Sequence, residues 1–396
     1  MEPMEGWTPA RAATPRPATS APSRANERTK VRAMAHALAD VAWEDCLLEP
    51  RRDPALEAFV REMQGMANPT IRYFASVPWL ARALVELHPE YGLLRRLDAG
   101  VSDMVALIVS QENSCRYCYS AVRALLWAQG MSKTRIDRIE QDLAGGNLPP
   151  RTRAAIVFGK AQSRSGPPAA HAACEALRAA GVDDDELKEI AYAVAVTDFN
   201  NRASTIPAIP TRPFERMPEL WHMRLLRPLL GRMLKSLRRK GEPVSLDGVP
   251  DLPYGQLVGA YAGSPIAPTL ARTLEGMWTS THLTRRCKLL MLAVIARGLS
   301  CERCARDLTP SIAAEGLDDA ARDRILTHLA GPELDATERL LVPFARETIW
   351  YEPARIQRRA RALRAELSEP QLVEAIGVAA LGNGLCRMAA ILACTA

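Results

Sequence analysis

Apolar residues recur at helical spacing from about Val31 to the C-terminus, and the alternation typical of strands is rare. Gly-Gly and Pro-Pro pairs, such as those between 145 and 150, separate the helical stretches. By contrast, residues 1–30 are rich in Pro, Ala, Ser, Thr and Arg and show no periodicity. The pattern therefore predicts an all-α fold preceded by a disordered tail at 1–30.

Several landmarks in the chain recur at one spacing. Three of them share an offset of 186 positions without any gap: Cys115–Cys118 with Cys301–Cys304, Gly130 with Gly316, and Phe158 with Phe344. Three landmarks at one offset are hard to obtain by chance, and such self-similarity is the signature of a repeat. The sequence therefore predicts two tandem helical domains, at 31–206 and 249–396, joined by a linker at 207–248.

The linker carries a strongly basic segment, MRLLRPLLGRMLKSLRRK, which predicts a basic helix. Such a segment could bind nucleic acid or anionic lipid. A helix that docks its apolar stripe on a domain and turns its charges to water is commoner, and we favour it. The stripe expected to dock consists of Leu226, Leu230, Met233 and Leu237. Pro228 and Gly231 are expected to weaken a long continuous helix.

Composition narrows the class of protein. Hydrophobic residues make up 48% of the chain, charged residues 24% and aromatic residues 5%, which is typical of a soluble helical protein. A net charge of +6 over 396 residues does not indicate nucleic-acid binding. The longest apolar run, Leu289 to Ala296, is shorter than the ~18 residues that span a membrane. The start MEPMEGW lacks the features of a secretory signal, so we expect a cytoplasmic location.

Each Cys-x-x-Cys pair follows a serine, Ser114 before Cys115 and Ser300 before Cys301. Because serine is a good N-cap, each helix is expected to begin at the first cysteine. The unpaired N–H groups and the positive dipole end at a helix start stabilise a thiolate, lowering a cysteine pKa from ~8.5. Positions i and i+3 share a helix face, so each pair could cycle between dithiol and disulfide.

Two other interpretations of the cysteines were weighed. A zinc site built from both pairs would need pairs spaced by about 15–20 residues, far closer than these. A structural role suits buried lone cysteines, which behave as small apolar residues. The cysteines that fit this second interpretation are Cys46, Cys174, Cys287 and Cys394. We therefore expect redox thiols at the two pairs, with no metal and no cofactor.

The segment DMVALIVSQENSCRYCYSAVRALLWAQGMSKTRI, from Asp103 to Ile136, resembles the core motif of the carboxymuconolactone decarboxylase superfamily, within its alkyl hydroperoxidase D-like branch. FNNRAS at 199–204 resembles that family's downstream Asn-Arg segment. KLLMLAVIARGLSCERCARDLTPSIAAEG resembles the core motif more weakly. The resemblance implies two tandem alkyl hydroperoxidase D-like helical domains, of which the second is the more divergent, and a tendency to form homo-oligomers.

In the redox members of that family, the second cysteine reacts with the peroxide and the first resolves it. The resemblance therefore implies that Cys118 attacks and Cys115 closes the disulfide. It gives Cys304 and Cys301 the same roles in a possible second site. Asp103 stands at the position of the family's relay acid.

The chain departs from the family at the relay histidine. Val122 and Leu308 occupy that position in the two domains, and Leu289 replaces the acid in the second. Without general acid–base assistance, a site is expected to be slower by ~10²–10⁴. Pro310 is expected to kink or end the second helix early. We therefore expect the first domain to be the active one.

Nearby charges could compensate for the missing relay. Arg116 or Arg123 could stabilise a thiolate at Cys118, and Arg303 could do so in the second domain. Glu112 could replace the missing base.

Taken together, these features predict a thiol-dependent oxidoreductase that reduces hydroperoxides or disulfides and is restored by a thiol reductant. The alternative is a catalytically degenerate scaffold or binding protein of the same fold. A decarboxylase is disfavoured, because lactone decarboxylation does not require a dithiol.

Overall fold

The computed structural model describes residues 38–65, 68–141, 147–164, 168–211, 214–215, 217, 220–246 and 248–392. Within these ranges the chain is helical, and its one isolated bridge joins Tyr91 to Arg239. The prediction of an all-α fold is confirmed. The tail predicted at 1–30 and the lone Cys394 lie outside the described residues.

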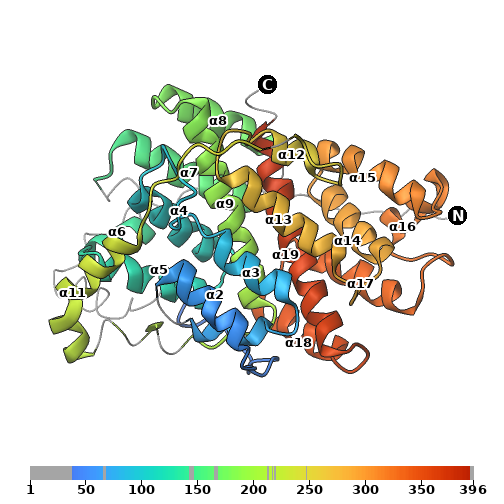
Figure 1. Cartoon of the computed structure of the whole chain (residues 1–396), viewed down its shortest axis with the longest axis horizontal. Helices are drawn as coiled ribbons and strands as arrows, with labels where there is room; N and C mark the ends of the chain where they lie inside the picture. Colours follow the sequence, from blue (N-terminus) through green and yellow to red (C-terminus); the bar gives the residue numbers. More distant parts are fainter. Residues whose placement is uncertain are drawn as a thin grey trace, which may run out of the picture.

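The first part of the chain holds short elements followed by a set of longer helices (Figure 1). The short elements are α2 (Pro54–Gln64), the 3-10 helix η1 (Pro69–Phe74) and α3 (Pro78–Glu86). The longer helices, here called the N-terminal set, are α4 (Ala99–Glu112), α5 (Arg116–Ala128), α6 (Lys133–Gln141), α7 (Pro150–Arg164), α8 (Pro168–Ala179) and α9 (Asp184–Thr205).

The second part has a similar order. After α11 (Trp221–Leu237) come α12 (Gly255–Gly259) and α13 (Ile266–Thr279). The C-terminal set then consists of α14 (Arg285–Gly298), α15 (Glu302–Ala314), α16 (Asp319–His328), α17 (Ala336–Glu347), α18 (Pro353–Leu363) and α19 (Glu369–Leu392). Helices α4 and α14 both have 14 residues, and α5 and α15 both have 13.

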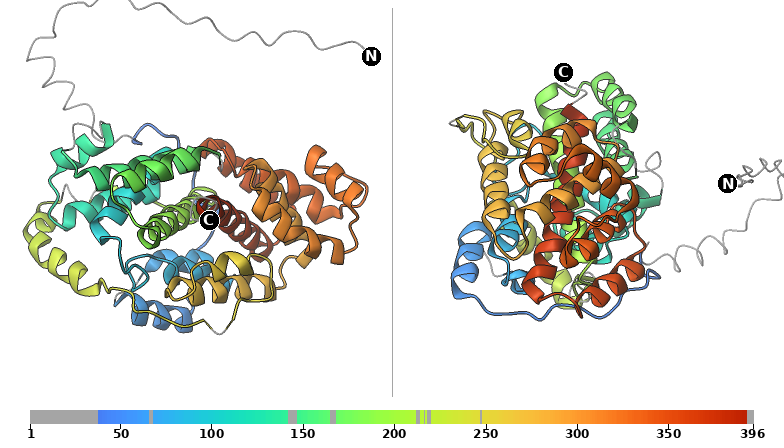
Figure 2. Two further views of the ribbon diagram at one scale, coloured as in Figure 1. Left: turned by 90° about the horizontal axis from the view of Figure 1, so that it is seen from above. Right: turned by 90° about the vertical axis from the view of Figure 1, so that its right-hand side faces the viewer.

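The longest helices, α9 and α19, form the centre of the molecule. They make the most extensive contact between any two described helices, and Figure 2 shows them side by side, with the rest of each set on its own side. Both are buried on nearly all faces, which explains why their sequences lack a polar stripe. A Cβ at Gly384 would lie 2.7 Å from the carbonyl oxygen of Ala195, so glycine is needed at this crossing.

A buried polar network joins the two sets across this centre. Arg202 on α9 donates through Nε to the carbonyl of Thr348 at 2.8 Å, just beyond α17. Arg387 on α19 donates through Nε to the carbonyl of Gln162 at 3.2 Å, near the end of α7. Both guanidinium groups contact Oδ2 of Asp198, at 2.7 and 3.1 Å. The Asn-Arg segment singled out in the sequence is therefore part of the contact between the two sets.

Helix α11 docks on the end of α5 through a basic residue. Arg227 donates to the carbonyls of Trp127 at 2.8 Å and Met131 at 3.1 Å. Of the predicted docking stripe, Leu230 packs against the core, whereas Leu226 and Met233 are exposed. The docked face of α11 is thus only partly the one we expected.

The sequence also suggested that Pro228 and Gly231 would weaken this helix, but α11 continues through both to Leu237. Gly231 helps the docking, since a Cβ there would lie 3.0 Å from the carbonyl oxygen of Ala128. Several apolar side chains of α11 remain on the surface: Trp221, Leu225, Leu226, Leu229 and Met233.

One helix among the described residues is long and apolar enough to cross a membrane, Glu369–Ala390 within α19. Its most apolar stretch is entirely buried inside the protein. This is the usual environment of a core helix in a soluble protein, so α19 is weak evidence for a membrane span.

Candidate dithiol sites

The first cysteine pair lies where α4 turns into α5. Ser114 adopts a left-handed conformation, with φ at 51°, and the N–H of Cys115 then donates back to the carbonyl of Ser110 at 3.0 Å. This is the hydrogen-bond pattern of a glycine-type helix stop, made here with serine. The turn places Cys115 at the N-cap of α5, with Cys118 in the first turn.

The helix therefore begins one residue later than the sequence suggested, and serine is not its cap. The sulfur of Cys115 takes the capping role by accepting the N–H of Cys118 at 3.2 Å. Ser114 does not cap α5 because it takes part in the turn that ends the preceding helix, α4. In the second pair, Ser300 also adopts a left-handed conformation, with φ at 53°, and Cys301 is the N-cap of α15.

Cys118 is held as a thiol by its surroundings. Burial raises its pKa well above the ordinary value, the neighbouring Cys115 raises it further, and Ser204 partly offsets both. Its Sγ donates to the carbonyl of Asn200 at 3.6 Å. The Cys115 sulfur thus accepts a hydrogen bond, whereas the Cys118 sulfur donates one.

In the second pair the two sulfurs contact each other directly. Cys301 and Cys304 are both reduced, and their Sγ atoms are 2.8 Å apart and share a hydrogen bond. Hydrogen bonding with Cys304 and Cys386 lowers the pKa of Cys301 to about 4. The same bonds raise the pKa of Cys304. The negative charge of this group therefore resides on Cys301.

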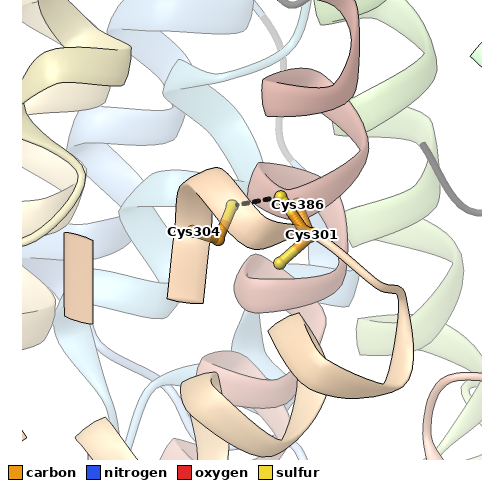
Figure 3. Close-up of side chains that lie close together, drawn as sticks. All are labelled: Cys301, Cys304 and Cys386. Carbon is orange, nitrogen blue, oxygen red and sulfur yellow. Dashed lines mark hydrogen bonds between the residues drawn. The ribbon is translucent and has the colours of Figure 1, made fainter. Parts of the chain in front are cut away.

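The structure adds a third sulfur that the sequence reading missed. Cys386, on α19, is buried beside Cys301 and Cys304, and ligand atoms of the three lie within 4.8 Å of one another. Figure 3 shows the three side chains converging from the start of α15 and from α19. An offset of 185 rather than 186 would have aligned Arg387 with Arg202, and hence Cys386 with Asn201. That one-residue shift is the signal that could have found it.

Asp103, expected as the acid of a relay, lies in a cluster formed with the linker. It accepts hydrogen bonds from Gln129 at 3.0 Å and from Arg238, which also pairs with Glu90 at 3.0 Å. Burial and the nearby Glu90 raise the pKa of Asp103, and Arg238 opposes them. Among the described residues these contacts tie α4 to the segment after α11.

The charges expected to support Cys118 are engaged elsewhere. Arg116 pairs with Glu215 at 2.6 Å, and Arg123 pairs with Glu140 at 2.8 Å and with Asp137. Arg303 behaves as expected, since its positive charge contributes to the lowered pKa of Cys301.

Glu112, considered as a substitute base, pairs with Lys160 at 3.4 Å. The residues at the relay positions are apolar and pack in the core. Val122 is half-buried against the core, while Leu308 and Leu289 are fully buried.

The helix of the second pair is also longer than expected. Pro310 lies inside α15, which continues to Ala314 and equals α5 in length. The prediction that Pro310 ends this helix early is wrong. Packing of Leu308 and Ile312 into the core, on either side of the proline, holds the turn in helical form.

One cavity of about 390 Å³ lies between α3 and α13. Its walls include Trp79, Arg82, Glu86 and Arg272, and no cysteine is among the residues that line it. It is therefore separate from both cysteine pairs.

No protein family matches the sequence of this chain, and no curated protein matches it either. Several solved structures are similar to part of it, among them the following two. The alkylhydroperoxidase AhpD core of an uncharacterized peroxidase-related protein from Ralstonia eutropha JMP134 is 22% identical, with a TM-score of 0.39 over 45% of this chain and 99% of that one. An uncharacterized peroxidase-related protein from Silicibacter sp. TM1040 is 20% identical, with a TM-score of 0.38 over 45% of this chain and 97% of that one.

Proposed function

We propose that the chain is a thiol-dependent oxidoreductase of the alkyl hydroperoxidase D-like type, which reduces hydroperoxides with the dithiol Cys115–Cys118. The observation that carries the proposal is the hydrogen bond from the N–H of Cys118 to the sulfur of Cys115, at a helix start. Such a bond stabilises a thiolate, which is the nucleophile in thiol chemistry. Cys115 thus takes the attacking role that the family resemblance gives to Cys118.

The reaction runs in two steps that together move two electrons. The Cys115 thiolate attacks the terminal oxygen of the hydroperoxide, the O–O bond breaks, and the alcohol leaves after taking a proton, which leaves a sulfenic acid on Cys115. The Cys118 sulfur then attacks the Cys115 sulfur, a disulfide forms, and water leaves with the Cys118 proton. An external dithiol reduces the disulfide and restores the pair.

We also propose that the chain arose by tandem duplication of one helical unit. The equivalent helices support this, since α4, α5, α14 and α15 begin at a common offset of 186. Repeated contacts support it as well. The N–H groups of Leu97 and Leu283 each donate at 2.7 Å to a glutamate on the central helix of their set, Glu189 and Glu374. The domain limits of 31–206 and 249–396 follow from this proposal.

We also propose that the chain forms homo-oligomers and is located in the cytoplasm. The exposed apolar residues of α11 support the first, because monomers rarely leave a contiguous apolar surface uncovered. Leu225 and Leu229, four residues apart on one face, are 71% and 64% exposed.

The proposal is tested by counting thiols in the fully reduced, metal-free chain after mixing with an alkyl hydroperoxide. We expect two thiols to be lost for each hydroperoxide consumed at the first pair, and peptide mapping to find a Cys115–Cys118 disulfide. Cys118→Ser should stop at a sulfenic acid on Cys115, while in Cys115→Ser the remaining Cys118 should stay unoxidised. Cys46→Ser, at a lone cysteine outside the pairs, is the matched control and should behave as the parent chain does.

The second candidate is a binding scaffold without catalysis. The apolar residues at the relay positions and the burial of both pairs favour it. Hydroperoxide that persists while Cys115 and Cys118 stay reduced in a folded chain would support the scaffold and overturn the enzymatic proposal.

A further inference from the structure

The three-thiol cluster (Cys301, Cys304 and Cys386) differs from a redox pair in the number of sulfurs that converge. A disulfide forms from two sulfurs, so that reaction does not require the third. All three side chains are nearly inaccessible to solvent, at 3%, 2% and 0% exposed. Among the described residues, this is the group of cysteine, histidine and acidic side chains whose ligand atoms lie close enough together to hold one metal ion.

The first pair provides an internal comparison. At the place equivalent to Cys386, the N-terminal set has Asn201, which accepts a hydrogen bond from Ser110 at 3.0 Å and donates to the carbonyl of Val109 at 3.3 Å. There the side chain ties α9 to α4 and offers no sulfur. The third sulfur is therefore a specific property of the C-terminal set.

The surroundings of the cluster suit a negatively charged group of thiolates. Arg303 acts on Cys301, and the buried Arg387 follows Cys386 in the chain and interacts with it electrostatically. Positive charge on both sides offsets the charge that three thiolates bring.

A buried hydroxyl is also directed at the cluster. Tyr254 is 1% exposed, and its backbone has φ at 71°. The side chain of Tyr254 interacts electrostatically with Cys386, Cys304 and Cys301. Asp307, on the same helix as the cysteine pair, accepts the N–H of Tyr254 and holds this conformation. A phenol in this position can donate a hydrogen bond to a metal-bound thiolate, as outer-shell groups do.

We propose that the three-thiol cluster is a binding site for a soft metal ion of low coordination number, namely Cu(I), held by the sulfurs of Cys301, Cys304 and Cys386. Thiolate ligands select soft ions such as Cu(I). Structural zinc sites almost always take four protein ligands, and the cluster has three. Binding displaces the thiol protons to solvent and requires no oxidant or reductant. The proposal is independent of peroxide chemistry at Cys115 and Cys118.

The test titrates the reduced, metal-free full-length chain with Cu(I) under anaerobic conditions, against the chromogenic chelator bathocuproine disulfonate. We expect one Cu(I) per chain to be retained, with only sulfur in the first shell of the copper X-ray absorption spectrum. Cys386→Ser should weaken retention at least about tenfold, since even outer-shell changes cost 10–100-fold. Cys46→Ser should retain copper as the parent chain does.

A second measurement keeps the proposal testable if Cys386→Ser fails to fold. Copper should protect Cys301, Cys304 and Cys386 of the parent chain together from alkylation, leaving Cys115 and Cys118 as reactive as in the metal-free chain. Loss of all copper to the chelator, protection of Cys301 and Cys304 without Cys386, or tighter retention of Zn(II) with oxygen or nitrogen ligands would each overturn it. Copper retention and peroxide-driven thiol loss are separate readouts, so either proposal can fail alone.

Discussion

The first cysteine of each pair is an N-cap and the second lies in the first helical turn, so their sulfurs meet different neighbours. In the first pair, the sulfur of Cys115 accepts a hydrogen bond from the N–H of Cys118, and in the second, the sulfurs of Cys301 and Cys304 share one at 2.8 Å. The pKa of the second cysteine is raised in both. Two cysteines have the same pKa when free, so the difference between the two members of a pair comes from their positions in the helix.

This inequality predicts a pH dependence for alkylation. The raised pKa keeps Cys118 protonated at neutral pH, so its thiolate fraction and its alkylation rate should rise about tenfold per pH unit between pH 7 and 9. The pKa of Cys301 is about 4, so that residue is already a thiolate and its rate should stay flat over the same range. Peptide-resolved alkylation of the metal-free chain measures both, and a flat profile at Cys118 would contradict the assignment.

At this scale the sequence located the pairs correctly at helix starts but missed what surrounds them. The Cys-x-x-Cys spacing and the preceding serine were enough to place a helix within one residue. Cys386 was missed because an offset of 186 does not align it with Asn201, and because its place beside Cys301 depends on how α19 packs against α15, 82 residues beyond Cys304. Arg116 and Arg123 were misjudged for the same reason, since their partners come from other helices.

Among the elements, the turns before α5 and α15 determine where the first cysteine of each pair lies. Ser114 and Ser300 have φ of 51° and 53°, a region that disfavours residues with a Cβ. In each turn the cysteine N–H closes the preceding helix by donating to Ser110 or to Ala296. The same backbone path thus ends one helix and presents the cysteine at the start of the next.

Replacing a strained serine by glycine should therefore stabilise the fold. Ser300→Gly is expected to increase the free energy of unfolding by about 1 kcal/mol, because the left-handed region costs a non-glycine residue roughly 1–2 kcal/mol. Urea unfolding followed by circular dichroism measures the change. Ser311→Gly makes the same chemical change inside α15 and should instead destabilise by roughly 0.5–1 kcal/mol. Equal effects at the two positions would show that the turn is not strained.

Element boundaries were partly predictable from local rules. The helical periodicity and the caps gave the right class of element, yet Pro228 and Pro310 both lie inside continuous helices. The expectation that proline ends a helix rests on one lost hydrogen bond and a local clash. It leaves out the apolar contacts that Leu230 and Ile312 make with the core beyond each proline.

In the whole molecule, the buried network around Asp198 links the N-terminal and C-terminal sets. Arg202 and Arg387 each reach across to a carbonyl of the other set, and both contact the same carboxylate. The Cys pairs revealed the offset of 186, but the network could not be inferred, because sequence spacing says nothing about which faces of two units meet.

Breaking this network should destabilise the whole chain. Arg202→Met removes hydrogen bonds to Thr348 and Ile349 and leaves Asp198 with one fewer positive partner. Loss of one member of a buried ion pair is expected to cost about 3–5 kcal/mol of unfolding free energy. Arg358→Met, at an exposed pair with Glu44, is the matched control and should cost about 0–1 kcal/mol. A loss below about 1 kcal/mol for Arg202→Met would refute this role for the network.

Arg202 and Arg387 each donate a hydrogen bond to the other helical set, and this arrangement bears on how the two cysteine sites can come to differ. A unit that paired with a second copy of itself through this isologous face would carry every side chain twice, so its two sites would be chemically identical. Joining the units in one polypeptide keeps the face at high effective concentration while freeing each half to mutate alone. Asn201 and Cys386 occupy equivalent places with different chemistry. In the proposed duplication, covalent linkage is what allows the Cys115–Cys118 pair and the three-thiol cluster to differ in this way.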